Sequence, residues 1–173
     1  MPITNLPSLS ADAPWTGAPP DPLDEPALYD GLLWRRPIAY LLDLVLIALA
    51  AFAVWALLGL LSILSFGLLL PLQVVVLTLL PLAYHTWFIG SRGATPGMRL
   101  LDVELRSWTG ARPDYTRAAL QTALFYVTVA LTTWLVLIVA LFNDRRRTVH
   151  DYLGGTVGVR HSRIGAAALP AAA

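Results

Sequence analysis

The charged residues of this 173-residue chain are confined to a few short stretches. No Asp, Glu, Lys or Arg lies between Asp43 and Arg92, and none lies from Ala118 to Asn143. An ionised side chain at the centre of a bilayer is disfavoured by about 2.5–3.5 kcal/mol on insertion scales, so membrane segments produce such gaps. The chain as a whole is 57% hydrophobic and 13% charged, whereas soluble domains are roughly 25% charged. The sequence therefore predicts an integral membrane protein whose main partner is the lipid bilayer.

Several other classes of protein are excluded by composition. The chain has no cysteine, which excludes a disulfide scaffold, and its net charge of +1 gives no basis for nucleic-acid binding. No nucleophile–base pair or paired carboxylates are visible, so we expect no enzyme activity and no cofactor. His150-Asp151 is too short a motif for a metal site, because such a site needs three or four ligands. We therefore expect no bound metal.

Both ends of the chain have the composition of disordered tails. Residues 1–34 contain seven prolines, five acids and no base, and residues 164–173 are mostly small. Such segments cannot bury enough apolar surface to offset the entropy of ordering them. Only a short helix near residues 25–33 is expected in the acidic N-terminal tail, which leaves 35–163 as the membrane domain.

Three apolar helical segments are expected within that domain. A membrane span needs about 20 residues, so the block from 37 to 89 predicts two helices, at about 37–60 and 72–90. Pro37 is expected in the first turn of the first helix, and the cluster from Ser62 to Pro71 marks the turn between the two. A third segment, at about 118–142, is long enough to span with some tilt.

The polar loop at 91–117 predicts a short strand. Leu101, Val103 and Leu105 alternate with Asp102, Glu104 and Arg106, a period of two that favours a strand with one face in water. Residues 155–159 form a second β-like run. We expect an all-α membrane protein with a small cytoplasmic β-hairpin-like element made from these two runs. Residues 93–97 lack the Gly-Lys-Ser/Thr ending of a phosphate loop and predict a tight turn at the membrane surface.

The arginines favour a topology with both termini in the cytoplasm. Arginine at 35–36, in the 91–117 loop and at 145–147 is expected on the cytoplasmic side of a plasma (inner) membrane. Two spans satisfy this rule, but a third crossing would export residues 145–147. Either the rule is broken once, or the third segment does not cross cleanly. In the second case it forms a re-entrant pair broken at Thr132-Thr133, or its first half lies along the interface.

Asp43 is the one charge inside the first apolar block. It lies six residues beyond Pro37, which places it roughly 9 Å into the membrane at 1.5 Å per residue. An acid in such a place either binds a cation or proton, or forms a buried ion pair that ties the first helix to the C-terminal segment. Arg36 lies two turns away on the same helix face, and the expected partners of Asp43 are Arg146, Arg147 and His150.

Three motifs occur in a characteristic order. They are Arg36-x-x-Ala39-x-x-x-Asp43, then Gly93-Ala94-Thr95-Pro96-Gly97-Met98-Arg99, then Arg147-Thr148-Val149-His150-Asp151-Tyr152-Leu153-Gly154-Gly155. Together they resemble the RDD family of small bacterial and archaeal membrane proteins over residues 32–160. The family takes its name from one arginine and two aspartates, and by motif position the resemblance implies Arg36, Asp43 and Asp151. The secondary candidates are His150, Arg147, Thr95, Gly97 and Arg99.

The resemblance implies a transport role, since sodium/proton exchange has been suggested for some members of the family. We therefore expect an ion or small-solute transporter with Asp43 as its intramembrane acid. Three short segments form only a thin pathway, so a transporter of this size is expected to be a homo-oligomer. The alternative is a membrane adaptor or assembly factor that transports nothing. In that case the arginine and aspartates are structural pairs, and the N-terminal tail recruits a protein partner.

Overall fold

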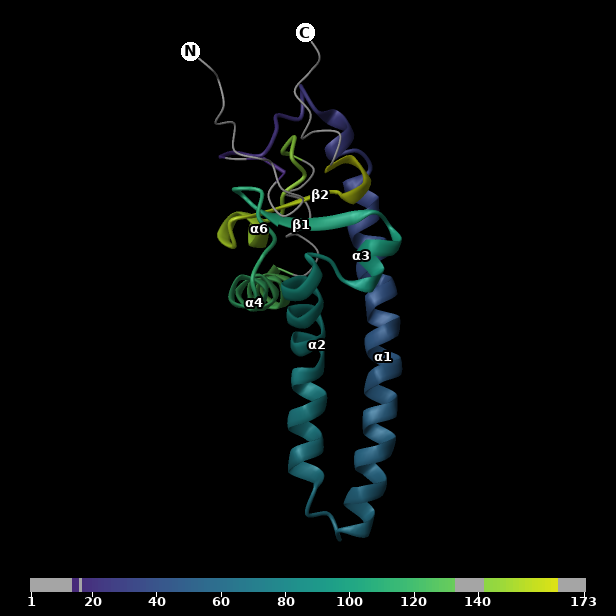
Figure 1. Cartoon of the computed structure of the whole chain (residues 1–173). Coiled ribbons are helices and arrows are strands. Elements are labelled where there is room, and N and C mark those ends of the chain that lie inside the picture. The colour runs from purple at the N-terminus through teal and green to yellow at the C-terminus, as the bar shows by residue number, and fades with distance from the viewer. Residues whose placement is uncertain (1–13, 16, 133–141, 165–173) are drawn as a thin grey trace, which may run out of the picture.

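The molecule is a long two-helix stalk with a small head at one end (Figure 1). The computed structural model describes residues 14–15, 17–132 and 142–164. Helix α1 (Leu32–Leu64) descends the stalk and helix α2 (Leu70–Arg92) returns antiparallel to it. The turn between them contains Phe66 and Gly67, both with positive φ. The two predicted helices and the turn between them are therefore confirmed, and each helix is longer than expected.

Helix α1 begins five residues before Pro37, which lies inside the helix and not in its first turn as expected. The reason is tertiary packing, because Leu32 is buried in the head against Leu28 and Val159. At 1.5 Å per residue the 33 residues of α1 are about 50 Å long, which exceeds the ~30 Å hydrocarbon thickness. About 20 residues counted back from Leu64 reach residue 45, so the first third of α1 is left to pack in the head.

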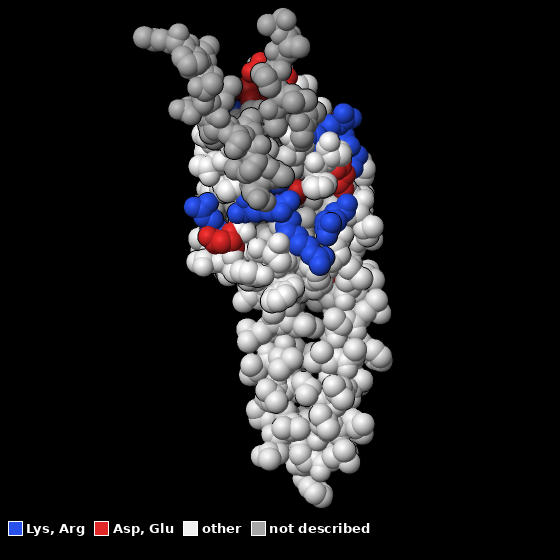
Figure 2. Space-filling model, viewed as in Figure 1, with Lys and Arg blue, Asp and Glu red and all other residues white. Residues whose placement is uncertain are grey.

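The stalk has the surface of a membrane-embedded pair of helices. Two helical stretches among the described residues, Pro26–Leu64 and Leu70–Arg92, are long and apolar enough to cross a bilayer. Large apolar side chains along both are exposed, and Figure 2 shows no charge on the visible face of the stalk. Near its far end Gln73 bridges the helices, donating to the backbone oxygen of Trp55 at 3.3 Å and accepting from Ser62 at 3.4 Å.

Beyond α2 the chain forms a short helix and a two-stranded sheet in the head. Helix α3 (Pro96–Leu100) lies beside α1, and strand β1 (Val103–Ser107) pairs antiparallel with β2 (Thr156–Arg160), with Leu105 opposite Gly158. The predicted pairing of the two β runs is confirmed. The predicted wet face is wrong, because all five residues of β1 are buried. Glu104 and Arg106 tolerate burial because they form an ion pair at 2.8 Å.

Helix α4 (Tyr115–Thr132) does not follow the stalk. Figure 1 shows it nearly end-on, across the head end of α2, with which it makes its main contact. The expectation of a third apolar membrane helix is not confirmed, since only two candidate spans occur in the described part of the chain. The remainder of that expected segment, with the proposed break at Thr133, lies at 133–141, outside the described residues. Helix α6 (Val149–Leu153) then leads into β2.

Part of the predicted N-terminal tail packs onto the sheet. Trp15, Leu28 and Tyr29 are buried together with Val103 and Val157, and the Trp15 indole donates to the backbone oxygen of Trp108 at 3.1 Å. The expected short helix is a 3-10 turn, η1 (Pro26–Leu28), and a second one, η3 (His161–Arg163), follows β2. Three large hydrophobic side chains thus order a segment whose overall composition is that of a tail.

Candidate functional site

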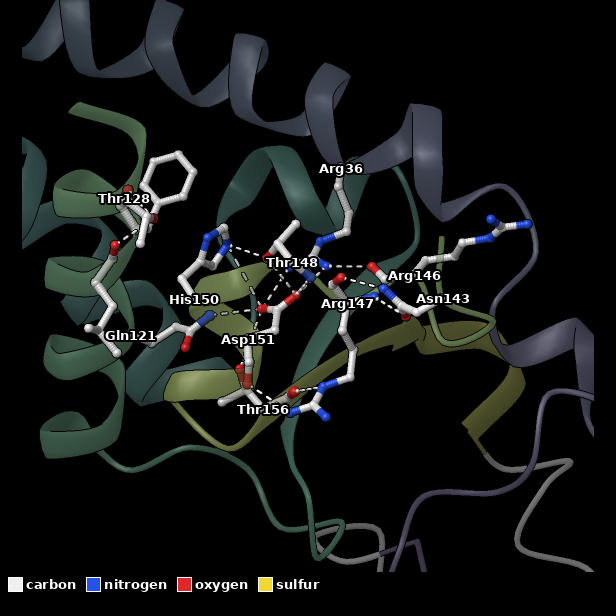
Figure 3. A network of polar contacts seen from close by, with 12 residues as sticks. Arg36, Gln121, Thr128, Asn143, Arg146, Arg147, Thr148, His150, Asp151 and Thr156 are labelled. Atoms are coloured by element: carbon white, nitrogen blue, oxygen red, sulfur yellow. Dashed lines mark hydrogen bonds and ion pairs between the residues drawn. The ribbon is translucent and has the colours of Figure 1, made fainter. Parts of the chain in front are cut away.

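Arg36 of α1 reaches the head and binds Asp151 of α6 (Figure 3). The two guanidinium nitrogens lie 2.6 and 3.0 Å from the two carboxylate oxygens, so the pair is bidentate. Arg36 also donates to the backbone oxygen of Arg146 at 3.2 Å. Its guanidinium packs against Gly158 of β2, where a side chain would touch it at 3.4 Å. The pair thus joins the first helix to the C-terminal motif.

Asp151 uses all of its accepting capacity inside the head. Besides Arg36 it accepts from the Gln121 amide at 2.8 Å, from the Thr148 backbone at 3.0 Å and hydroxyl at 2.9 Å, and from Thr156 at 3.4 Å. Burial alone would raise the pKa of Asp151, but the charge and hydrogen bonds of Arg36 outweigh it and hold the pKa well below its ordinary value. An ionised carboxylate has about four lone-pair sites. Asp151 is therefore a saturated structural anion.

Arg147 stabilises the same motif through hydrogen bonds to backbone oxygens. Its guanidinium donates to the backbone oxygens of Thr156 and Asp151, both at 2.9 Å, and stacks on Trp108 and Tyr152. Arg147 therefore orients the chain around Asp151 through hydrogen bonds to the backbone.

His150 is neutral in the folded protein. Burial lowers its pKa to about 4, a change that the nearby Asp151 charge only partly opposes. Thr148 donates its one hydroxyl proton to Asp151, so at 2.8 Å it accepts from Nε2 of His150. Nδ1 of His150 is then an unprotonated acceptor, and it is buried with no hydrogen-bond partner among the described residues.

Asp43 forms a second, separate centre further along α1. Its carboxylate accepts three hydrogen bonds: from the Tyr84 hydroxyl at 2.9 Å, the Thr95 hydroxyl at 2.5 Å and the Gly97 backbone at 2.9 Å. All three donors are neutral. In the described part of the chain no arginine or histidine pairs with Asp43, so the expectation of a basic partner is wrong. Its side chain is nonetheless buried, with the residue 1% exposed.

The segment after α2 contains two of the three donors to Asp43, Thr95 and Gly97. Gly93 ends α2 in the left-handed conformation, with φ of 70°, and Thr95 begins α3 as its N-cap, accepting from the Met98 backbone at 3.2 Å. Gly97 then lies so close to α1 that a Cβ atom would fall 2.3 Å from the backbone oxygen of Ala39. The small residues at 39 and 97 therefore let α3 approach α1 closely enough to hold Asp43.

A cavity of about 510 Å³ connects the two centres. Asp43 and Thr95 lie on its wall, and so do Arg36 and His150. The wall between them is largely apolar, with contributions from Tyr40, Leu41, Leu44, Ile89, Phe125 and Val129. The cavity is thus mostly apolar, with a few polar groups on its wall.

Three buried polar atoms on the cavity wall have no hydrogen-bond partner among the described residues. They are Oε1 of Gln121, Oγ1 of Thr122 and Nδ1 of His150, on residues at most 4% exposed. Gln121 gives an amide proton to Asp151 and so is oriented with its oxygen free. The Gln121 oxygen and the His150 nitrogen can only accept. Two buried acceptors without a hydrogen-bond partner in the described structure therefore belong to residues of the cavity wall.

Comparison with known protein families identifies the chain. The profile described as the RDD family matches residues 31–155, most of the chain. The chain belongs to the RDD family. Comparisons with curated proteins and with solved structures returned no match. Membership and the two apolar helices together make this RDD protein a membrane protein.

The arginine and two aspartates of the RDD protein do not form one cluster. Arg36 and Asp151 are paired, whereas Asp43 lies two turns along α1 from Arg36, with partners of its own. Thr95 and Gly97 both hold Asp43, and Arg147 and His150 both surround Asp151. Arg99 is exposed and belongs to neither centre. The candidates thus divide between an ion-paired aspartate, Asp151, and an aspartate held by neutral donors, Asp43.

Sequence reasoning missed Tyr84 and Gln121. Tyr84 lies near the head end of α2, and Gln121 lies near the start of the apolar third segment. The one amide side chain in that apolar segment was the available signal for Gln121. For Tyr84 there was none, because interfacial tyrosines are common in membrane helices.

Proposed function

We propose that this RDD protein binds a cation, or a small solute bearing hydrogen-bond donors, at Asp43 and carries it across the membrane. The observation that carries the proposal is the contrast between the two aspartates. Asp151 is saturated by Arg36 and its neighbours, while Asp43 has only neutral donors in the described structure and lies on the cavity wall. With three of about four lone-pair sites used, one site of Asp43 can accept from a ligand.

The chemistry of the cavity supports a cationic ligand or one rich in donors. The Asp43 carboxylate on its wall can only accept hydrogen bonds when ionised, so it favours ammonium, hydroxyl groups, hydrated metal ions or protons over anions. Arg36 also lies on the wall, but its charge is neutralised by Asp151 at 2.6 Å. Arg146 lies on the wall as well, and Asp43 is the one carboxylate among the described residues that line the cavity. Proton exchange for a cation at this carboxylate is the reaction that we propose.

We further propose a multi-pass protein of the bacterial inner membrane with the head in the cytoplasm. Charged side chains gather in the head, away from the α1–α2 turn, and the positive-inside rule then assigns the head to the cytoplasm (Figure 2). Since α4 crosses the head end of α2, the third apolar segment starts along the interface. Residues 145–147 and the C-terminus then stay on the cytoplasmic side, and a homo-oligomer completes the pathway that two spans leave open.

The second candidate is an adaptor or assembly factor. The bidentate pair of Arg36 and Asp151 is a structural tie of the kind that this function needs. The N-terminal segment packed on the sheet presents an exposed Leu23 and Asp24 that a protein partner could recognise. This function needs no ligand at Asp43.

Cation flux into liposomes carrying the Asp43→Asn variant tests the proposal. The amide oxygen introduced by this substitution can still accept from Gly97 and Tyr84, and the Thr95 hydroxyl can turn to accept from the amide nitrogen, so the variant is expected to fold. Sodium-driven proton flux, read with a pH-sensitive dye, should fall to the level of empty liposomes. Asp24→Asn, an equal charge change on the exposed N-terminal segment, should leave flux unchanged. Normal flux in a well-folded Asp43→Asn variant would refute the proposal.

A further inference from the structure

A second pocket lies in the head where α2 ends. It has a volume of about 420 Å³ and is lined by Ser91, Arg92, Ala94, Arg99, Val103, Glu104, Arg112 and His161. None of these residues lines the cavity that contains Asp43. The two sites are therefore separate, and the chemistry of this one is different.

The pocket carries an excess of positive charge. Glu104 is the one acid among its lining residues, and that carboxylate is already bound by Arg106 at 2.8 Å, Arg112 at 3.2 Å and His161 at 2.5 Å. Arg92 and Arg99 are exposed, and no acidic side chain in the described part of the chain pairs with either. Two such guanidinium groups in one pocket form a site for an anion.

Aromatic residues near the pocket indicate its position relative to the membrane surface. Trp87 is exposed on α2, and its ring lies 5.9 Å from that of Tyr115. Exposed tryptophan and tyrosine rings on membrane helices lie at the level of the lipid headgroups. Arg92 follows Trp87 by five residues, or about 7.5 Å along the helix, which brings the pocket to the level of the headgroup phosphates.

We propose that this pocket binds the phosphate group of an anionic lipid headgroup, with Arg92 and Arg99 as its ligands. Guanidinium groups suit phosphate because they donate two parallel hydrogen bonds. A zwitterionic lipid fits less well, because its ammonium group needs an acid and Glu104 is already engaged by three basic side chains. The lipid source is favoured over free phosphate by the height of the pocket at the membrane surface.

Native mass spectrometry of the purified protein in detergent tests the site. Short-chain phosphatidylglycerol, short-chain phosphatidylcholine and inorganic phosphate are titrated separately into wild type and into the double variant Arg92→Gln/Arg99→Gln. At about 1 kcal/mol, or fivefold, for each arginine near the membrane surface, phosphatidylglycerol should bind the variant roughly 25-fold more weakly. Arg117→Gln/Arg163→Gln, an equal loss of charge at exposed positions outside the pocket, should bind as wild type does.

Three outcomes would overturn the inference. Equal weakening in the two double variants would mean that overall charge, and no site, attracts the lipid. Equal binding of phosphatidylcholine and phosphatidylglycerol would remove the preference for an anionic headgroup. Inorganic phosphate that displaces phosphatidylglycerol at equal concentration would identify a site for soluble phosphate. Arg92→Lys/Arg99→Lys guards against misfolding, since it keeps the charge and should retain most of the binding.

Discussion

Replacing Gly97 by alanine tests whether the close approach of α3 to α1 holds Asp43 in place. A Cβ atom at position 97 would lie 2.3 Å from the backbone oxygen of Ala39 and 2.9 Å from the Asp43 carboxyl carbon. Ordinary contact begins near 3.4 Å, so α3 has to move about 1 Å away from α1. Both contacts are with rigid or hydrogen-bonded groups, and no flexible side chain can turn aside to absorb the methyl group.

That movement breaks hydrogen bonds as well as packing. The Gly97 backbone now donates to Asp43 at 2.9 Å, and a shift of about 1 Å takes it beyond the usual 2.7–3.2 Å range. Overpacking costs about 1–3 kcal/mol, and a hydrogen bond to a charged group contributes about 1.5–3 kcal/mol. Since α3 is only five residues long and can yield in part, we expect the free energy of unfolding to fall by about 3 kcal/mol.

The assay is chemical unfolding of the purified protein in detergent, followed by tryptophan fluorescence. Gly59→Ala is the matched control, because the same methyl group on α1 would meet its nearest atom, on Gln73, at an ordinary 3.8 Å. That variant should unfold within about 1 kcal/mol of wild type, the difference in helix propensity between glycine and alanine. If Gly97→Ala and Gly59→Ala unfold alike, the reasoning about α3 and Asp43 is wrong.

Three further predictions concern the head. Arg36→Gln should lower the free energy of unfolding by about 3–5 kcal/mol, because it leaves Asp151 buried and unpaired, and a double-mutant cycle with Asp151→Asn should show strong coupling in the same unfolding assay. His150 has a pKa of about 4 when folded and 6.5 when unfolded, so its stabilising effect is complete above pH 6.5 and is lost as the pH falls toward 4. Wild type should lose about 3 kcal/mol over that window at 1.36 kcal/mol per unit, and a His150→Gln variant whose stability declines as steeply would contradict this. Cysteines at exposed Leu23 and Arg163 should react with an impermeant maleimide only from the cytoplasmic side, and a cysteine at Leu68 in the α1–α2 turn only from outside; any reversal would refute the proposed topology.

The parts of the fold that could be predicted from the sequence are those with a local signal. Charge-free runs of the right length predicted α1 and α2, and alternation predicted β1 and its pairing with β2. The wet face of β1 was wrong because alternation cannot show that Glu104 and Arg106 neutralise each other under a covering segment. That cover depends on Trp15 and Leu28, whose burial is a tertiary event in a segment of disordered composition.

The site was predictable in its residues but not in its pairing. Spacing placed Arg36 and Asp43 two turns apart on one helix face, and hydropathy indicated that Asp43 needs a partner from elsewhere in the chain. Neither could show that Arg36 turns to Asp151, more than 100 residues away in sequence, or that Asp43 is held by a tyrosine, a threonine hydroxyl and a backbone N–H. Such partners leave no mark in composition, because all three are common in membrane proteins.

The different roles that we propose for the two aspartates follow from the different partners that each has in the folded protein. Asp151 is paired with the full positive charge of Arg36. A transported cation would have to break this pair, and Asp151 and Arg36 would then be exposed to an apolar cavity. Asp43 gains only neutral donors, so a cation or a proton that reaches it adds the countercharge that it lacks. In the proposed function the same three donors hold Asp43 with and without its ligand. A carboxylate held in this way can exchange its ligand without unfolding its surroundings, which is what a transport site requires and a structural ion pair does not.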